Sequence, residues 1–536
     1  MRFENLSGDA SLDWVARATA DYLARTLAQA LDGPMLNSDA LARNGLGLGI
    51  EPGGAPGSSA QRSDAIAAGA TRIVSGTLER SNGGIRISAT TEDLVTHKSV
   101  NAVAVTESDP MKAMASLAHA LSPRAGAYLT SNEEALRLYT ESLEQPAAEA
   151  VKATGQVVSK DPNFGPAWVR LTALTAGSGD RAGAEGIIAK ALAQNIDALD
   201  RANLDMLRAN FGTDTDAKIR ALARVCELTP ADTGLLQTLA NLESTRGKFA
   251  EAARDWKKLA SLLPGNIEAL NQEGYNLAWA GDLAGSLAAF EEYRKLRPND
   301  PNVLDSIGDT QFLYWKFSDA AASYLAAYAK NAQFQEGGDL YKAAWAQYRA
   351  GDKSKADATF AKFQAARGKS SEEVRTLMEG DWLYRTGRQK EAMDRLRKAP
   401  ASATISAQLA VWDLMAGDRA AAAKELSPVT QISTAVVLVA KFACLPSASA
   451  EEWNDRAGKS IHGNGSEGIR DLALGYALIL DDRKAAAIPV WERIVNSAPA
   501  TDFFVRAVLT KLKGERPKFA LLPDPNTTNQ MRALVE

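Results

Sequence analysis

Few side chains in this sequence have the types and spacing that catalysis requires. None of the three histidines, His97, His119 and His462, neighbours a Ser, Cys or carboxylate in a recognisable nucleophile arrangement. Adjacent carboxylates such as Glu133 and Glu134 would point to different faces of a helix, so they do not form an acid–base pair. We therefore expect no catalytic residues and no enzymatic activity, and we interpret these side chains as structural.

The sequence also lacks the patterns of metal and phosphate sites. Cys226 and Cys444 are the only cysteines and lie far apart, so with three histidines they do not make up the ligand set of a zinc site. The stretch Gly45–Gly57 lacks the spacing of a phosphate-binding loop, and Pro52 and Pro56 remove amides that a phosphate would need. We expect a loop here, and neither a metal nor another cofactor.

A different set of side chains could recognise a peptide. Polar, acidic and aromatic residues recur in pairs three or four positions apart, which places both members of a pair on one face of a helix. If exposed, they would offer partners for the backbone amides and basic side chains of an extended peptide. The set is Gln237 and Asn241, Asn271 and Tyr275, Asp305 and Asp309, Tyr341 and Trp345, and Asp381 and Tyr384. The alternative is a hydrated groove without a ligand.

The elements that carry this set repeat along the chain. Pro230, Pro264 and Pro298 recur at a constant interval, and the glycine turn at Gly247 recurs at the same interval. The interval is about 34 residues, with a glycine turn in its middle and a proline at its end. This pattern is similar to that of tetratricopeptide repeats, a family of helical hairpins. We expect about ten hairpins over residues 131–500, without strands, whose first helices line a concave groove.

The packing inside a repeat follows from residue size. Ala240 on the first helix of one repeat is small, which lets that helix approach Ala252 on the second helix closely. Gly274 and Ser286 occupy the same two positions in the next repeat. Large residues such as Trp256 should then form the core between the two helices.

Residues 1–125 mix helical and strand patterns and should form a separate α+β domain. The segment Asn82-Gly83-Gly84 lies between two β-rich runs and suits the positive φ angles of a tight hairpin turn. We expect an antiparallel sheet over residues 72–106, with helices over residues 11–31 and 110–121 on one of its faces.

The same region resembles the TolB amino-terminal-like domain in Phe3–Asp9, Leu12–Trp14, Gly69–Gly76 and Ile85–Ala89. Domains of this family often precede tetratricopeptide repeats in bacterial signalling proteins, downstream of a kinase, winged-helix or cyclase module and usually after a membrane span. Met1 stands where relatives have the end of an apolar strand. The resemblance thus implies a missing first strand, an open sheet edge, and either the sensor-side portion of a longer protein or a reading frame that starts too late.

Composition and charge narrow the class of partner. Lys and Arg total 61 against 65 for Asp and Glu, so the chain has no basic excess with which to neutralise a nucleic acid. No run reaches the roughly 18 apolar residues of a membrane span, so we expect a membrane connection only through an upstream anchor. The expected partner is a protein or a peptide.

Together these patterns predict a mainly α protein, an α-solenoid of tetratricopeptide hairpins at 131–500 after a small α+β domain at 1–125, with a capping helix and tail at 501–536. The expected function is a non-enzymatic scaffold that binds protein or peptide in its concave groove. The alternative is the sensor or regulatory half of a bacterial membrane signalling protein whose catalytic or DNA-binding module is absent from this chain. The resemblance implies the periplasmic side of a membrane-anchored parent; without such an anchor the chain would be cytoplasmic.

Overall fold

The structure is a computed structural model that describes residues 3–28, 30, 35–36, 58–81, 83–367, 370–431, 435–444, 451–452, 455, 466–524 and 532–534. The predicted loop Gly45–Gly57 and His462 lie outside these residues. The chain divides into two compact units, and each is described by itself. Unit 1 consists of Met1–Glu243 and Ala250–Ala269, and unit 2 consists of Ser244–Phe249 and Leu270–Glu536.

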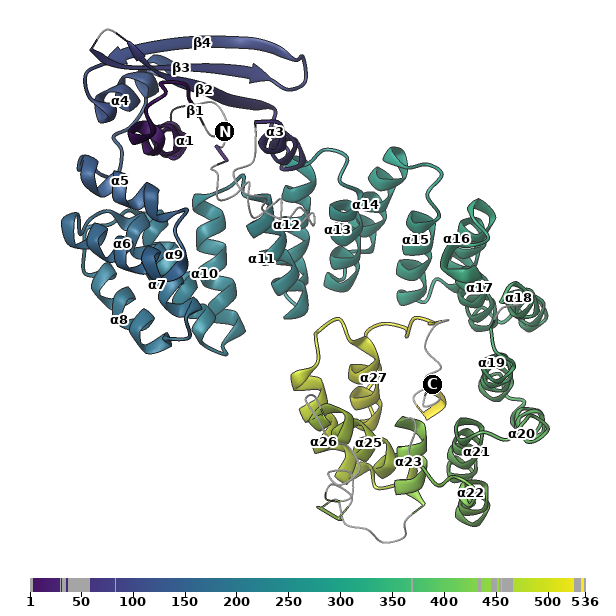
Figure 1. The fold of residues 1–536 in the computed structure, drawn as a ribbon. Coiled ribbons are helices and arrows are strands. Elements are labelled where there is room, and N and C mark those ends of the chain that lie inside the picture. The colour runs from purple at the N-terminus through teal and green to yellow at the C-terminus, as the bar shows by residue number, and fades with distance from the viewer. Residues whose placement is uncertain are drawn as a thin grey trace. The chain divides into compact units, whose positions relative to one another are not determined.

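Unit 1 begins with a four-stranded sheet in the order β1-β2-β3-β4 (Figure 1). Its strands are β1 (Glu4–Asn5), β2 (Arg72–Ser81), β3 (Gly84–Asp93) and β4 (Lys98–Glu107). Strands β2, β3 and β4 are antiparallel, and Ser81 pairs with Gly84 across the turn, where Gly83 has a φ of 86°. The pairing confirms the hairpin predicted at this turn. Glycine suits the position since it adopts a positive φ without steric cost.

The edge of this sheet at β2 is only partly covered. The short strand β1 runs parallel to β2 and pairs only at Thr77 and Leu78. Over residues 72–76, the described part of the chain adds no strand outside β2. The open edge that we expected is thus shortened by two residues, and Phe3 is buried against Gly76, where a Cβ would lie 2.3 Å from the phenyl ring.

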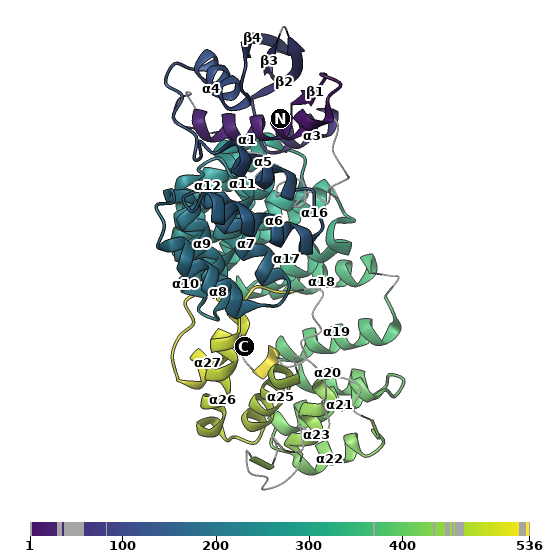
Figure 2. The same ribbon diagram turned by 60° about the vertical axis from the view of Figure 1, so that its left-hand side comes forward.

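Helices cover one face of the sheet, as predicted. They are η1 (Ala10–Leu12), α1 (Asp13–Leu27), α3 (Ser58–Ala67) and α4 (Pro110–Leu121). Ile85, Ile87 and Ala89 alternate along β3 and therefore point to one face, where they are buried in a common core with Trp14 of α1 and Leu117 of α4. Figures 1 and 2 both show α1 and α4 on the same side of the sheet.

The rest of unit 1 is helical, and the chain from 131 to 500 has no strand among its described residues. The following helices belong to unit 1, except for residues Ser244–Phe249, which connect α11 to α12 and belong to unit 2: α5 (Glu133–Ser142), α6 (Ala147–Lys160), α7 (Gly165–Gly177), α8 (Arg181–Leu192), α9 (Ala198–Phe211), α10 (Thr215–Leu228), α11 (Thr233–Thr245) and α12 (Phe249–Leu262). Consecutive helices pack as hairpins, α5 on α6, α7 on α8 and α9 on α10.

Unit 2 continues the same arrangement. Its elements are α13 (Ile267–Ala280), α14 (Leu283–Leu296), α15 (Pro301–Leu313), α16 (Phe317–Lys330), η2 (Phe334–Gly337), α17 (Gly338–Arg349), α18 (Lys353–Ala366), α19 (Glu372–Arg385), α20 (Gln389–Arg397), α21 (Ala403–Met415), α22 (Arg419–Leu426), α23 (Ala435–Ala443), α25 (Ser466–Leu480), α26 (Lys484–Ser497), α27 (Phe503–Leu512) and η3 (Arg532–Leu534). No described helix of the chain combines the length and the apolar character that a membrane span needs.

Small residues let the two helices of a repeat approach each other, as expected. A Cβ on Gly274 of α13 would lie 2.5 Å from the ring of Phe290 on α14, and a Cβ on Gly308 of α15 would lie 2.6 Å from the ring of Tyr324 on α16. In the earlier repeat Ala240 is fully buried opposite Trp256. The aromatic side chain of the second helix therefore occupies the space that a larger residue on the first helix would need.

The turn inside a repeat is built from a glycine followed by an aspartate. Gly281 has a φ of 107°, and the Asp282 carboxylate then accepts a hydrogen bond from the backbone amide of Gly285 at 2.8 Å, which caps α14. In the next repeat Trp315 takes the place of the glycine, with a φ of 56°. A left-handed conformation costs a residue with a side chain about 1–2 kcal/mol, so this one turn is strained.

Unit 2 contains two large apolar clusters among its described residues. The Trp345 cluster lies around α17 and includes Phe312, Tyr341, Trp345 and Trp382. The Trp491 cluster lies around α25 and α26 and includes Val439, Leu474, Trp491 and Val505.

Candidate functional site

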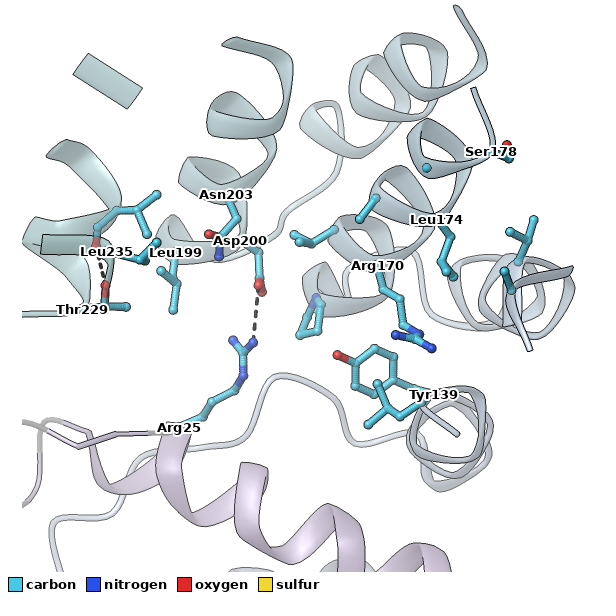
Figure 3. A pocket seen from close by; sticks show the side chains of 18 of the residues that line it. Arg25, Tyr139, Arg170, Leu174, Ser178, Leu199, Asp200, Asn203, Thr229 and Leu235 are labelled. Atoms are coloured by element: carbon cyan, nitrogen blue, oxygen red, sulfur yellow. Dashed lines mark hydrogen bonds and ion pairs between the residues drawn. The ribbon is translucent and has the colours of Figure 1, made fainter. Parts of the chain in front are cut away.

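A pocket of about 720 Å³ opens in unit 1 on the first helices of successive hairpins (Figure 3). Helices α5, α7 and α9 form most of its wall, and residues of α6, α10, the start of α11 and the end of α1 complete it. A volume of this size is within the range of about 300–1,000 Å³ that ligand pockets have. It is large enough to take several side chains of an extended peptide.

The positions that line this pocket continue the register of the predicted groove. Asn203 lies one repeat period before Gln237, and Val169 lies one further period before Asn203. Stepping back from Asn241 in the same way leads through Leu207 to Ala173 and then to Tyr139. Asn203, Val169, Ala173 and Tyr139 all line the pocket. The repeat period is thus the signal by which the sequence could have located this site, had the register been extended upstream of α11.

The walls of the pocket are mainly apolar. The apolar side chains come mainly from the first helices, and two of them, Val151 and Val225, come from the second helices α6 and α10. The apolar residues are Leu143, Val151, Val169, Ala173, Leu174, Leu199, Val225 and Leu235. A ligand that removes such an apolar surface from water is bound more tightly, because burial of apolar surface is favourable.

Arg170 of α7 supplies a positive charge to one side of the pocket. Its Nη2 donates a hydrogen bond to the backbone oxygen of Ser142 at 2.5 Å, and its Nε donates to Ser142 Oγ at 3.2 Å. These two bonds hold the guanidinium at the end of α5. Among the described residues Arg170 forms no ion pair, so its charge is available to an anionic group of a ligand. In Figure 3, Arg170 lies beside Tyr139, away from Arg25 and Asp200.

Arg25 and Asp200 close the other side of the pocket. Arg25 projects from α1 of the sheet domain, and its Nη2 lies 3.5 Å from Oδ1 of Asp200 on α9. Its other guanidinium nitrogens lie 3.4 Å from Asp21 and 3.6 Å from Asp197. This cation therefore connects the sheet domain to the first hairpins (Figure 3).

Burial raises the pKa of Asp200 to about 7, although Arg25 opposes this effect. Burial alone would lower the pKa of Arg25, but the carboxylates of Asp21 and Asp200 raise it instead, so Arg25 stays charged. Burial disfavours the ionised form of Asp200, because its Oδ2 is buried and accepts no hydrogen bond within the described chain.

The ten groove residues named from the sequence are distributed differently. Gln237 and Asn241 on α11 are exposed, as the groove interpretation requires. The other eight belong to unit 2. Four of them are half-buried: Asn271, Tyr275, Asp381 and Tyr384. The remaining four, Asp305, Asp309, Tyr341 and Trp345, are buried, and the expectation that these four are exposed is wrong.

The two aspartates are buried because they pair with a lysine that sequence reasoning missed. The ammonium of Lys342 on α17 donates to Asp305 Oδ1 at 2.7 Å and to Asp309 Oδ1 at 3.0 Å. Tyr275 and Tyr324 each donate a hydroxyl hydrogen bond to Asp309, at 3.0 and 2.8 Å. Neighbouring first helices do bring this part of the predicted set together, as a closed network rather than as an open strip.

A third aspartate makes this network unusually acidic. Asp339 of α17 is fully buried, and burial together with the neighbouring Asp305 carboxyl group raises the pKa of Asp339 well above its usual range. Burial and the nearby Asp305 charge also raise the pKa of Asp309. Burial would lower the pKa of Lys342, but Asp309 and Asp305 reverse this and raise it. The physical result is a charged lysine among three carboxyl groups that do not all ionise.

The buried aromatic pair belongs to the Trp345 cluster. Trp345 meets the ring of Trp382 edge-on at 4.7 Å, and the guanidinium of Arg385 lies 3.9 Å above the Trp345 ring. Asp381 accepts a hydrogen bond from Arg385 at 2.8 Å, and Tyr384 stacks on Trp412 at 4.4 Å. These contacts account for the half-buried and buried positions as packing within unit 2.

The sequence of the chain is similar to that of a known repeat protein. A segment of 92 residues is 34% identical to part of the TPR repeat-containing protein PA4667 of Pseudomonas aeruginosa. The helical hairpins are thus similar to tetratricopeptide repeats. The match spans 17% of this chain and only 16% of that relative. No protein-family model matches the chain, so the resemblance to TolB-like domains stays a prediction.

Solved structures with a similar arrangement of helices include the following two. The structure of Naa15/Naa10 bound to HypK-THB is 12% identical, covers 71% of this chain and 61% of that chain, and has a TM-score of 0.39. The yeast Tom70 structure is 12% identical, covers 76% of this chain and 92% of its own, and has a TM-score of 0.31.

Proposed function

We propose that this chain is a non-enzymatic scaffold that binds a protein partner through an extended peptide segment in the pocket of unit 1. The observation that supports this most is the convergence of the groove register on one place. Residues at the same repeat positions on α5, α7 and α9 line a single apolar pocket of about 720 Å³. Peptide binding in a groove of this kind needs apolar anchors and a few placed polar groups.

The polar groups of the pocket define the kind of segment that fits. Arg170 offers a cation that no described carboxylate neutralises, whereas Asp200 on the other side is buried beside Arg25. The walls between them are aliphatic. The segment that suits this arrangement has aliphatic or aromatic side chains with an acidic residue at the end nearer Arg170. The exposed Gln237 and Asn241 would extend the contact along α11.

The test uses a random-peptide library displayed on phage, selected on the full chain, followed by titration of the recovered synthetic peptides. Selected peptides should share an acidic residue beside apolar ones. Arg170→Gln should weaken their binding about three- to tenfold, mainly at low salt, where the charge interaction is least screened. Arg137→Gln is the matched control, because Arg137 is exposed on α5 and lies outside the pocket. Equal losses in the two variants would contradict the proposed site.

A further inference from the structure

Three backbone carbonyls at equivalent places in successive repeats accept hydrogen bonds from the carboxy-terminal part of unit 2. They belong to Thr245, Trp279 and Leu313, which follow one another at the repeat period and lie in the last turns of α11, α13 and α15. The last four carbonyls of a helix have no partner within that helix. The repeat therefore places the carbonyls of these three helix ends at equivalent positions.

The carboxy-terminal segment donates to each of these three carbonyls. The Ala500 amide donates to the Thr245 oxygen at 2.8 Å, and the Ala520 amide donates to the Leu313 oxygen at 3.0 Å. The Lys518 ammonium donates to the Trp279 oxygen at 3.4 Å. We call Arg516–Leu522 the strap. It follows α27 and has neither helix nor strand structure (Figure 1).

The side chains of the strap alternate between two cores. Ala520 and Leu522 pack against the Trp345 cluster, whereas Leu521 between them packs against the Trp491 cluster. Alternation with a period of two is the property of an extended chain. The strap thus joins the first hairpins of unit 2 to its last ones.

Phe519 anchors the strap. It is 8% exposed, and its ring lies edge-on at 5.7 Å from Tyr314 and at 5.6 Å from Phe503. Arg516 lies 5.3 Å above the ring of Trp315, the residue whose backbone is strained at the repeat turn. The surface that contacts the strap is therefore aromatic, with carbonyl acceptors beside it. It contacts a basic residue, Lys518, followed by an aromatic one, Phe519.

We propose that the carbonyls of Trp279 and Leu313, with the aromatic rings beside them, form a second docking site for an extended basic–aromatic segment, and that the strap is its intramolecular ligand. The strap is held mainly by the packing of Phe519–Leu522, since a single backbone hydrogen bond joins it to α15 and its charged residues Arg516 and Lys518 are exposed. A segment held in this way opens locally at a much smaller cost than global unfolding. The isolated chain keeps the site closed, and loss of strap contacts makes it available.

The test is binding in trans, with full-length protein throughout. The probe is a labelled peptide of residues 514–524, and the receptor is the full chain with Phe519→Ala and Leu522→Ala, which weaken its own strap. This variant should bind the peptide at least about tenfold more tightly than the wild-type chain, whose site is occupied. A peptide that carries Phe519→Ala and Ala520→Pro lacks the anchor and the amide donor, and it should not bind. Equal binding by the two receptors, or equal binding of the two peptides, would overturn the proposal.

A second measurement keeps the test valid if the double variant is poorly folded. In wild-type protein the amide of Ala520 should exchange with solvent more slowly than the exposed amides around it, and Phe519→Ala should remove that protection. Glu515→Gln, an exposed change just before the strap, is the matched control and should leave the protection unchanged. Fast exchange at Ala520 in the wild-type chain would contradict the docking site.

Discussion

Lys342 on α17 places its ammonium 2.7 Å from Asp305 Oδ1, on the first helix of the preceding repeat. The pair is buried, and Asp309 shares the same ammonium at 3.0 Å. A buried charge that loses its partner is costly, because water no longer stabilises it. The network therefore links α15 to α17 in a way that depends on this single lysine.

We predict that Lys342→Met lowers the free energy of unfolding by about 3–5 kcal/mol, because it leaves buried carboxylates without a cation. Urea unfolding followed by circular dichroism measures this change. Lys330→Met is the control, since Lys330 is exposed on α16, and it should change stability by no more than about 0.5 kcal/mol. A loss below about 1 kcal/mol for Lys342→Met would show that the carboxyl groups tolerate the missing cation.

The titration of Asp200 predicts a pH dependence of stability. Its pKa is about 7 in the folded chain against 3.8 ordinarily, so between these values the unfolded chain has released a proton that the folded chain keeps. The free energy of unfolding therefore falls as pH rises through this window, and it changes no further above about pH 7. Asp200→Asn has no such proton. As pH rises through the window, its free energy of unfolding should therefore increase relative to that of wild type, by up to about 1.4 kcal/mol per pH unit.

Urea unfolding of both proteins at about pH 4.5 and about pH 8 checks this sign. Asp205→Asn, a change of a partly exposed carboxylate on the same helix α9, is the control and should show a smaller pH dependence relative to wild type. A difference between Asp200→Asn and wild type that stays constant with pH would mean that Asp200 is ionised in the folded chain throughout this range.

Glycine at the contact between paired helices should not tolerate a side chain. Gly274→Ala places a methyl group 2.5 Å from the ring of Phe290, so we expect a loss of about 1–3 kcal/mol from overpacking. Gly186→Ala on α8 meets no atom within 4 Å, and it should stabilise the helix by about 0.5–1 kcal/mol. Thermal unfolding of the two variants should therefore give shifts of opposite sign; shifts of the same sign would contradict the packing described for this repeat.

The features that the sequence predicts well are those that depend on local period and residue size. The helical hairpins, the glycine at position 274 and the turn before Gly84 each follow from residues close together in the chain. These patterns have a direct physical cause, either close helix approach or a positive φ. The helix faces that meet inside one repeat could be assigned for the same reason.

The exposure of the predicted groove residues could not be obtained in this way. Asp305 is buried because Lys342 neutralises it from 37 residues away, and a lone aspartate on a first helix otherwise indicates a solvated groove. Likewise, Lys518 reaches the carbonyl of Trp279 across 239 residues. Contacts of this kind depend on how repeats stack and where the chain end returns, which the repeat period does not specify.

The scaffold proposal is tested most directly by filling its pocket. Ala173 lines the pocket and is exposed, so Ala173→Tyr adds bulk there without disturbing the core. Ala189→Tyr makes the same change on the exposed face of α8, outside the pocket. The measurement is isothermal titration of library-selected peptides against both full-length variants. We predict that Ala173→Tyr weakens binding at least about tenfold while Ala189→Tyr matches wild type; wild-type affinity in Ala173→Tyr would contradict the pocket as the binding site.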